Sequence, residues 1–116
     1  MIELQGLELT GFHGALEEEK EHGQPFLFDV LLVAHDAGVR SDALADTVDY
    51  TEVVARVRAV SEGTRFNLIE ALAAAVADDL LDRFPVSRVR VRVRKPEVRL
   101  GAPAEFTAAT IERLRH

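Results

Sequence analysis

Residues 67–84, NLIEALAAAVADDLLDRF, carry the clearest helical pattern in the sequence. Apolar residues recur there at steps of three and four, the spacing of one helix face, so we expect that face to be buried. Asn67 and Glu70 have the spacing of a capping box, and Pro85 predicts that the helix ends at Phe84. Glu70 either only closes this box or holds a ligand. The apolar face comprises Leu68, Ile69, Leu72, Val76, Leu80 and Phe84.

The composition points to one globular domain over residues 1–116. Apolar residues make up 47% and charged residues 29%, which suits a chain with a buried core and a wet surface. The net charge of −6 argues against a nucleic-acid partner, because binding to phosphates needs a basic face. The lack of cysteine excludes disulfides, thiolate nucleophiles and cysteine-based zinc sites. With no membrane-length apolar run and no evident signal peptide, we expect a cytoplasmic protein.

Two strands are predicted in the first third of the chain. In Met1–Phe12, two pairs of alternating apolar residues are out of phase, and a bulge near Gly6 would reconcile them. Gln24–Ala34 is apolar on much of both faces and is expected to pair antiparallel with the first strand. The acidic segment Ala15–Gly23 between them predicts a loop with a single helical turn.

A second helix is predicted in the middle of the chain. Asp36–Asp46 has the composition of a connection. Asp49 and Glu52 form another capping pair, and the helix that they open is expected to end near Gly63.

The last third predicts two more strands. Val86–Arg94 alternates valine with arginine, so the valines should meet the helices and the arginines should face solvent or a wet interior. Phe106–Leu114 fits a fourth strand, although its AATIERLR segment also fits a short helix. The strand is preferred, because a hairpin with the preceding strand leaves fewer exposed edges.

These elements predict an α+β fold in the order β-β-α-α-β-β. It consists of a four-stranded antiparallel sheet with two helices on one face. Such a sheet has two open edges and one wet face. Oligomers that continue the sheet from subunit to subunit into a barrel would remove both edges.

Residues that commonly carry chemistry are sparse. The serines lack elbow glycines, no glycine-rich phosphate loop is present, and the histidines lack metal-ligand spacing, so we expect no metal. A histidine site formed by tertiary convergence stays open as an alternative, and His13 is the histidine expected near a pocket. The histidines are His13, His22, His35 and His116.

Three polar residues stand out, each with an ordinary structural explanation as well. Lys95 ends an arginine-rich strand and, unlike arginine, gives up its proton readily; otherwise it is a solvated cation. Tyr50, the only tyrosine, stands at a helix start, where an aromatic residue usually just packs. Glu19 belongs to an acidic loop, where carboxylates mostly serve solubility.

Four segments, in register over nearly the entire chain, resemble the dihydroneopterin aldolase family. They are GFHGALEEEKEHGQ at residues 11–24, DTVDYTEV at 46–53, NLIEALA at 67–73 and RKP at 94–96. The family has the tunnelling fold, or T-fold, which matches the predicted element order. The resemblance implies a homo-oligomer, a ring of four subunits commonly stacked as an octamer, with sites at subunit boundaries.

The resemblance also implies a site for a small pterin. Glu70 corresponds to the carboxylate that accepts two parallel hydrogen bonds from the pterin ring, and Ile69 adds backbone groups. Tyr50 corresponds to a residue that enters the site from the neighbouring subunit. Val48 would supply backbone contacts beside it.

The implied catalytic residues are Lys95, Glu19 and Tyr50, and the implied reaction belongs to folate biosynthesis. A base removes the 2′-hydroxyl proton of 7,8-dihydroneopterin, the C1′–C2′ bond breaks and glycolaldehyde leaves. The electrons flow into the N5=C6 imine, and protons shuttled by Lys95 through ordered water give 6-hydroxymethyl-7,8-dihydropterin. The substrate carries its own electron sink, so the resemblance implies no cofactor, metal or Schiff base. Epimerisation at C2′ is an implied side activity.

One departure and three rival functions remain. Many family members follow the Lys-Pro pair with further prolines, whereas this chain continues after Lys95-Pro96 with EVRLG. This difference leaves open which side chain, or tail, of the pterin substrate is accepted. Arg99 in that loop would favour an anionic tail. The rivals are a dihydroneopterin triphosphate 2′-epimerase, a zinc-dependent T-fold enzyme such as a pyruvoyl-tetrahydropterin synthase, and a non-catalytic pterin-binding module.

Overall fold

The computed structural model describes residues 1–34, 37–96 and 100–115. Within these ranges the chain forms four strands and two long helices, joined by shorter helical segments. None of the described helices is long and apolar enough to cross a membrane. In chain order the elements are β1 (Ile2–Gly11), α1 (Glu17–His22), β2 (Gln24–Ala34), α2 (Ala37–Ser41), η1 (Leu44–Asp46), α3 (Tyr50–Gly63), α4 (Ile69–Arg83), β3 (Val86–Lys95) and β4 (Thr107–Leu114).

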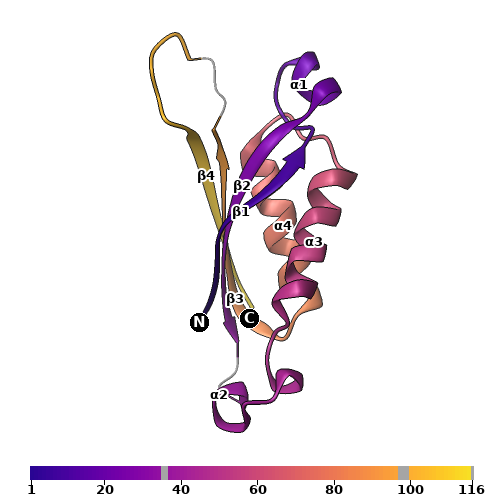
Figure 1. Cartoon of the computed structure of the whole chain (residues 1–116), viewed down its shortest axis with the longest axis vertical. Coiled ribbons are helices and arrows are strands. Elements are labelled where there is room, and N and C mark those ends of the chain that lie inside the picture. The colour runs from indigo at the N-terminus through magenta and orange to yellow at the C-terminus, as the bar shows by residue number, and fades with distance from the viewer. Residues whose placement is uncertain (35–36, 97–99, 116) are drawn as a thin grey trace.

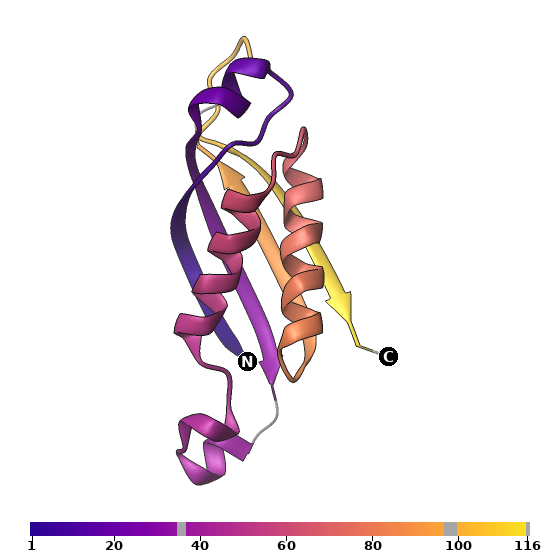
Figure 2. The same ribbon diagram turned by 90° about the vertical axis from the view of Figure 1, so that its right-hand side faces the viewer.

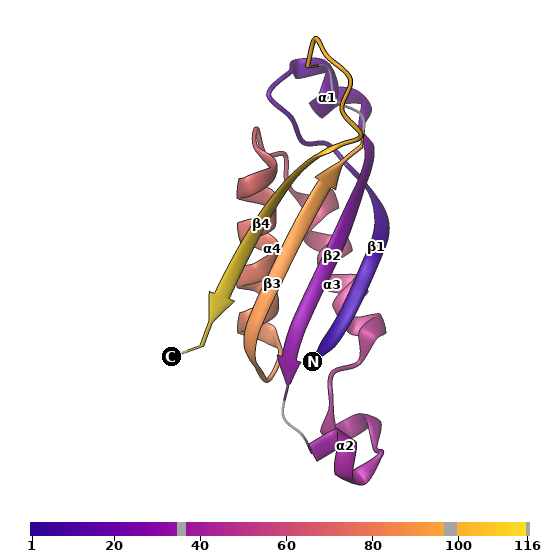
Figure 3. The same cartoon turned by 90° about the vertical axis from the view of Figure 1, so that its left-hand side faces the viewer.

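The four strands form one antiparallel sheet in the order β1-β2-β3-β4. The long helices α3 and α4 lie side by side on one face of the sheet (Figure 1, Figure 2). The opposite face, which we call the open face, carries neither of them (Figure 3). The predicted α+β class and the order of its six main elements are therefore confirmed.

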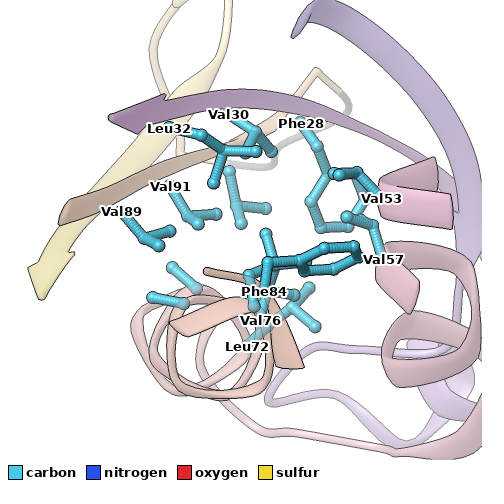
Figure 4. Packing of buried hydrophobic residues seen from close by; sticks show 14 of the residues in the cluster. Phe28, Val30, Leu32, Val53, Val57, Leu72, Val76, Phe84, Val89 and Val91 are labelled. Carbon is cyan, nitrogen blue, oxygen red and sulfur yellow. The ribbon is translucent and has the colours of Figure 1, made fainter. Parts of the chain in front are cut away.

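The core lies between the sheet and the two long helices (Figure 4). Val89, Val91 and Val93 of β3 are fully buried, as the valine–arginine alternation predicts. Leu72 and Val76 of α4 are also fully buried and belong to the same cluster. Burying an apolar side chain of this size contributes about 1.5–3 kcal/mol relative to leaving it exposed.

Strand β1 contains the predicted bulge at Gly6. Its register with β2 shifts between Leu4 and Leu7, and both leucines pack against the core. Gly6 has a φ of 68°, and its N–H donates a hydrogen bond to Oδ1 of Asp29 at 2.8 Å. Gln5 and Gly6 thus occupy the space opposite one residue of β2, which returns the following residues to the correct face.

The start of α4 differs from the predicted capping box, and that prediction is wrong. Leu68 is the N-cap residue, and its side chain forms no capping hydrogen bond. Asn67 lies one residue too early, and its side-chain oxygen instead accepts a hydrogen bond from Nζ of Lys20. Because Leu68 is extended rather than helical, it leaves the predicted apolar face and is exposed. The helix ends at Arg83, one residue before the predicted end.

The start of α3 follows the prediction more closely. Oδ1 of Asp49 accepts a hydrogen bond from the N–H of Thr51 at 2.9 Å, so Asp49 is the N-cap. The return bond from Glu52 that would complete a capping box is not formed in the described part of the chain. The helix ends at Gly63, as predicted.

Four other predictions gain detail. The predicted connection Asp36–Asp46, whose first residue lies outside the described residues, contains α2 and η1. Strand β2 has the predicted bounds, but only its helix-facing side is fully buried. Strand β3 continues one residue further, to Lys95. Residues 107–114 form a strand and not a helix, which confirms the preferred alternative.

Replacing Gly6 with alanine is expected to lower the free energy of unfolding by about 1–2 kcal/mol, because an L side chain is strained at positive φ. The nearest atom to an added Cβ, Nη2 of Arg94, is 3.9 Å away, so the cost comes from the backbone and not from a clash. Urea denaturation measures the change. The control is Gly63→Ala in α3, where a Cβ meets nothing within 4 Å; it should be neutral or stabilising. Equal losses in both variants would contradict the argument.

Candidate functional site

Glu19 of α1 and Lys95 at the end of β3 meet at one end of the molecule. Both elements reach the same end of its long axis (Figure 1). Nζ of Lys95 donates a hydrogen bond to Oε2 of Glu19, and the two side chains are only 15% and 17% exposed. The fold therefore joins two residues that are 76 positions apart into a largely buried ion pair.

Both oxygens of the Glu19 carboxylate are held. Oε1 accepts a hydrogen bond from the N–H of Leu16, and Oε2 accepts one from Nε2 of Gln24, both at 3.1 Å. Burial alone would raise the pKa of Glu19, but the hydrogen bonds from Lys95, Leu16 and Gln24 outweigh it and hold this pKa below its usual range. Glu19 is therefore ionised at neutral pH and attracts the ammonium group.

Gly14 leaves room for this carboxylate. Its φ is 151°, and a Cβ at this position would collide with the carboxylate of Glu19. The second glycine of the sequence GFHG is therefore required for the position of the ion pair.

The ion pair borders a hollow of about 760 Å³ between α1 and the strand ends. Gln24 lines it, and sequence reasoning missed this residue although Gly-Gln belongs to the family pattern. Thr107 also lines it, because it pairs with Lys95 in the ladder between β3 and β4. That partnership depends on the register of β4, which the sequence pattern does not fix. His22 also lines the hollow.

Ile69 and Glu70 begin α4 at the same end of the molecule (Figure 2). The segment before them is tied to α1, because Asn67 binds Lys20 and Nε of Arg65 donates to the carbonyl of Lys20 at 3.4 Å. Glu70 is exposed, and the first turn of α4 has no side-chain cap. Neither Ile69 nor Glu70 lines the hollow beside Lys95.

Tyr50 and Val48 belong to the opposite end. Helix α3 begins at Tyr50 on the side of α2, far from α1 (Figure 1). The molecule extends 51 Å along this axis and only 26 × 25 Å across it. Val48 is buried in the core, whereas Tyr50 is 54% exposed. One chain therefore does not bring Tyr50 to Lys95.

His13 is fully buried and joins two loops. Its Nδ1 accepts a hydrogen bond from the N–H of Phe66 at 3.0 Å, and its Nε2 lies 2.9 Å from the carbonyl oxygen of Ser61. The rings of Phe26 and Phe66 flank it, with centroids 5.4 and 5.9 Å away. The next residue, Gly14, donates its N–H to the carbonyl of Phe66 at 2.9 Å. These contacts clamp the loop before α1 to the loop before α4.

The clamp requires one neutral tautomer of His13. Because a backbone N–H donates to Nδ1, the proton must reside on Nε2, which donates it to the carbonyl of Ser61. Burial lowers the pKa of His13; the Ser61 carbonyl opposes this change, and the charge of Arg65 adds to it. A second proton, on Nδ1, would set two donors against each other and break the bond to Phe66.

No group of three or more His, Asp or Glu side chains that could hold a metal ion occurs among residues 1–34, 37–96 and 100–115. His13 is occupied by the clamp, and His22 is exposed. His35, His116 and Arg99 lie outside the described residues.

The free energy of unfolding is expected to fall as the pH drops below 6.5, the ordinary pKa of histidine. Below pH 6.5 the unfolded chain binds a proton at His13 and the folded chain does not, so acid favours unfolding. The stability that neutral His13 contributes is fully present above pH 6.5. Urea denaturation across a pH series measures this. His13→Gln keeps a donor for Ser61 but does not titrate, so it should flatten the slope. His22→Gln, at an exposed histidine, is the control and should keep it; a wild-type slope in His13→Gln would refute the assignment.

Comparison with known proteins places the chain in a family. A sequence model described as dihydroneopterin aldolase matches residues 2–112. The chain is 38% identical to the dihydroneopterin aldolase of Streptococcus pyogenes serotype M1, covering 98% of both proteins. It is also 38% identical to that of Streptomyces coelicolor, covering 98% of this chain and 97% of the relative. The crystal structure of Escherichia coli dihydroneopterin aldolase in complex with neopterin matches with a TM-score of 0.85 at 30% identity, covering 97% of this chain and 96% of that one. The chain belongs to the dihydroneopterin aldolase family.

Proposed function

We propose that the protein is an aldehyde-lyase that cleaves 7,8-dihydroneopterin into 6-hydroxymethyl-7,8-dihydropterin and glycolaldehyde. The ion pair between Lys95 and Glu19 is the observation that carries this proposal, because it holds a proton donor beside a hollow of about 760 Å³. The pterin seen in the Escherichia coli relative supports a substrate of this class. A cytoplasmic location remains a prediction from the sequence.

The proposed reaction is a retro-aldol cleavage. A base takes the proton of the 2′-hydroxyl, the C1′–C2′ bond breaks, and the 2′-carbon leaves as the carbonyl carbon of glycolaldehyde. The bonding electrons enter the N5=C6 imine and give an enol-like intermediate, which is then protonated at C1′. Addition of the same intermediate to the opposite face of the glycolaldehyde carbonyl re-forms the C1′–C2′ bond, and protonation of the 2′-oxygen would then give the C2′ epimer, the finer activity that we also propose.

Lys95 is proposed to move these protons through ordered water. The neighbouring strand residues are arginines, which hold their protons too tightly for this task. Glu19 is ionised and keeps the amino group of Lys95 at the edge of the hollow. We therefore assign proton transfer to Lys95, and positioning and substrate contact to Glu19.

Glu70 is proposed to anchor the pterin ring. A carboxylate accepts two parallel hydrogen bonds from the N3–H and 2-amino groups. The first turn of α4 is not capped by a side chain, so its free N–H groups, including that of Ile69, are available to the ring carbonyl. The failed capping box thus favours the ligand role of Glu70.

Tyr50 and Val48 are proposed to reach the site from a second copy of the chain. They lie at the far end of a molecule that is 51 Å long, so the same copy does not supply them. Strands β1 and β4 each have one edge unpaired in the described chain, and pairing between copies would close the sheet into a barrel. We propose a ring of four chains, stacked in pairs as an octamer, with residues 1–116 as one domain in each.

Lys95→Ala is expected to lower kcat about 10²–10⁴-fold, the usual contribution of positioned proton transfer. Lys95→Arg is the matched variant, since it keeps the charge beside Glu19 but does not release a proton readily. Lys95→Arg should bind the pterin like the wild type, but its kcat should be as low as that of Lys95→Ala. The assay follows glycolaldehyde and 6-hydroxymethyl-7,8-dihydropterin by chromatography in excess chelator.

The products also separate the rival functions. Wild-type cleavage in chelator contradicts a zinc enzyme. Epimer alone, from free or triphosphorylated substrate, would move the assignment to an epimerase. Pterin binding without any product, unchanged in Lys95→Ala, would reduce the protein to a binding module.

Mixing two inactive variants tests whether Tyr50 acts across a boundary between copies. Lys95→Ala and Tyr50→Ala chains, dissociated and reassembled together, should regain about a quarter of wild-type activity, because a quarter of randomly paired sites is intact. If both residues act within one chain, the mixture stays inactive. Light scattering gives the assembly, and a monomer mass would exclude the proposed role of Tyr50.

A further inference from the structure

Strand β3, which crosses the open face of the sheet (Figure 3), carries a row of arginines at alternate positions. Residues 88, 90, 92 and 94 alternate with the buried valines of β3 and therefore point away from the helices. The strand register sets two carboxylates directly opposite this row. Asp29 of β2 faces Arg92, and Glu112 of β4 faces Arg90.

The two carboxylates pair with the outer arginines instead. Asp29 lies 2.9 Å from Nη2 of Arg94 and also accepts the N–H of Gly6, and Glu112 forms an ion pair with Arg88. Four arginines thus share two carboxylates. The described residues give Arg90 and Arg92, in the middle of the row, no carboxylate partner.

A hollow of about 300 Å³ lies beside this unpaired charge. Arg90, Arg92 and Arg94 line it from one side, and residues of β1 and β2 line it from the other. The carboxylates in its lining are Asp29, already engaged, and Glu3, which accepts a hydrogen bond from Gln5. Three arginines against two carboxylates leave a positive excess in a chain of net charge −6.

Two further features of the arginines bear on ligand binding. The guanidinium of Arg92 lies 5.2 Å from the ring centroid of Phe106, which restricts its movement without neutralising it. Nε of Arg94 is buried and has no hydrogen-bond partner among the described residues. A charged donor buried without an acceptor is costly, so Arg94 is only partly compensated by Asp29.

We propose that this hollow binds a small anion with two linked phosphates, through Arg90 and Arg92. Guanidinium groups match phosphate oxygens in a two-pronged geometry, which lysine does not offer. Residues two apart on a strand are separated by about 6.6 Å, so linked phosphates reach both side chains better than one phosphate does. The hollow shares no lining residue with the one beside Lys95, so this site is separate from the proposed catalytic site.

Isothermal titration calorimetry with inorganic pyrophosphate, at constant ionic strength, tests the proposal. The wild-type protein should bind about one pyrophosphate per chain, and Arg90→Gln and Arg92→Gln should each weaken binding about tenfold or more. The control is Arg58→Gln on α3, an exposed arginine with the same change in charge, which should bind like the wild type. Both test variants should retain wild-type circular dichroism and wild-type cleavage of dihydroneopterin.

Three results would overturn the proposal. These are the absence of binding heat, equal weakening in Arg58→Gln, and loss of binding in Lys95→Ala, which would place the anion in the other hollow. Titration with ADP, which carries the same linked phosphates as an ester, then distinguishes the source of the ligand. Tighter binding of ADP than of pyrophosphate, with the same dependence on Arg90, would identify an esterified ligand, and weaker binding would identify the free anion.

Discussion

The contact between the valine face of β3 and the apolar face of α4 is the interaction on which the rest of the structure depends. Val89, Val91 and Val93 are excluded from water on one side of the strand, and Leu72 and Val76 cover them from the helix. This burial fixes which face of the sheet is dry. It also forces the intervening arginines onto the other face, where their charge must be solvated, paired with carboxylates or neutralised by a bound anion.

The same contact determines which ends of the helices and strands lie together. Helix α4 ends at Arg83 and β3 starts at Val86, so the strand runs back along the helix. The start of α4 and the end of β3 consequently lie at one end of the molecule, with Glu70 and Lys95 at those termini (Figure 2). The helix of 15 residues rises about 22 Å, whereas the strand of 10 residues spans about 33 Å. The strand therefore extends past the helix, and α1 packs in the space beyond it through Glu19.

Periodicity in the sequence predicts the elements whose faces are buried, because burial imposes the pattern. The alternation in β3, the apolar face of α4 and the phase break at Gly6 all had direct structural counterparts. The capping box at Asn67 failed because a tertiary contact with Lys20 competed for its side chain, and local spacing carries no trace of that contact. The partners of Glu19 come from three separate segments, so only the family resemblance suggested that Glu19 and Lys95 act together. The structure adds Gln24 and the clamp at His13, which depend on packing between loops.

The bulge at Gly6 has a consequence for the exposed edge of the sheet. Strand β1 lies at the edge of the sheet, and a regular edge is a template on which like strands stack without limit into fibrils. Gln5 and Gly6, which together oppose Asp29, interrupt the hydrogen-bond ladder and increase its local twist. A strand from another chain could therefore pair in regular register either before or after the bulge, but not along the whole of β1. An irregular edge of this kind disfavours the unlimited stacking of like strands. It still leaves a short regular stretch of β1 on which another strand can pair in one register. The residue that corrects the phase of β1 therefore also makes this edge a poorer template for the stacking of like strands.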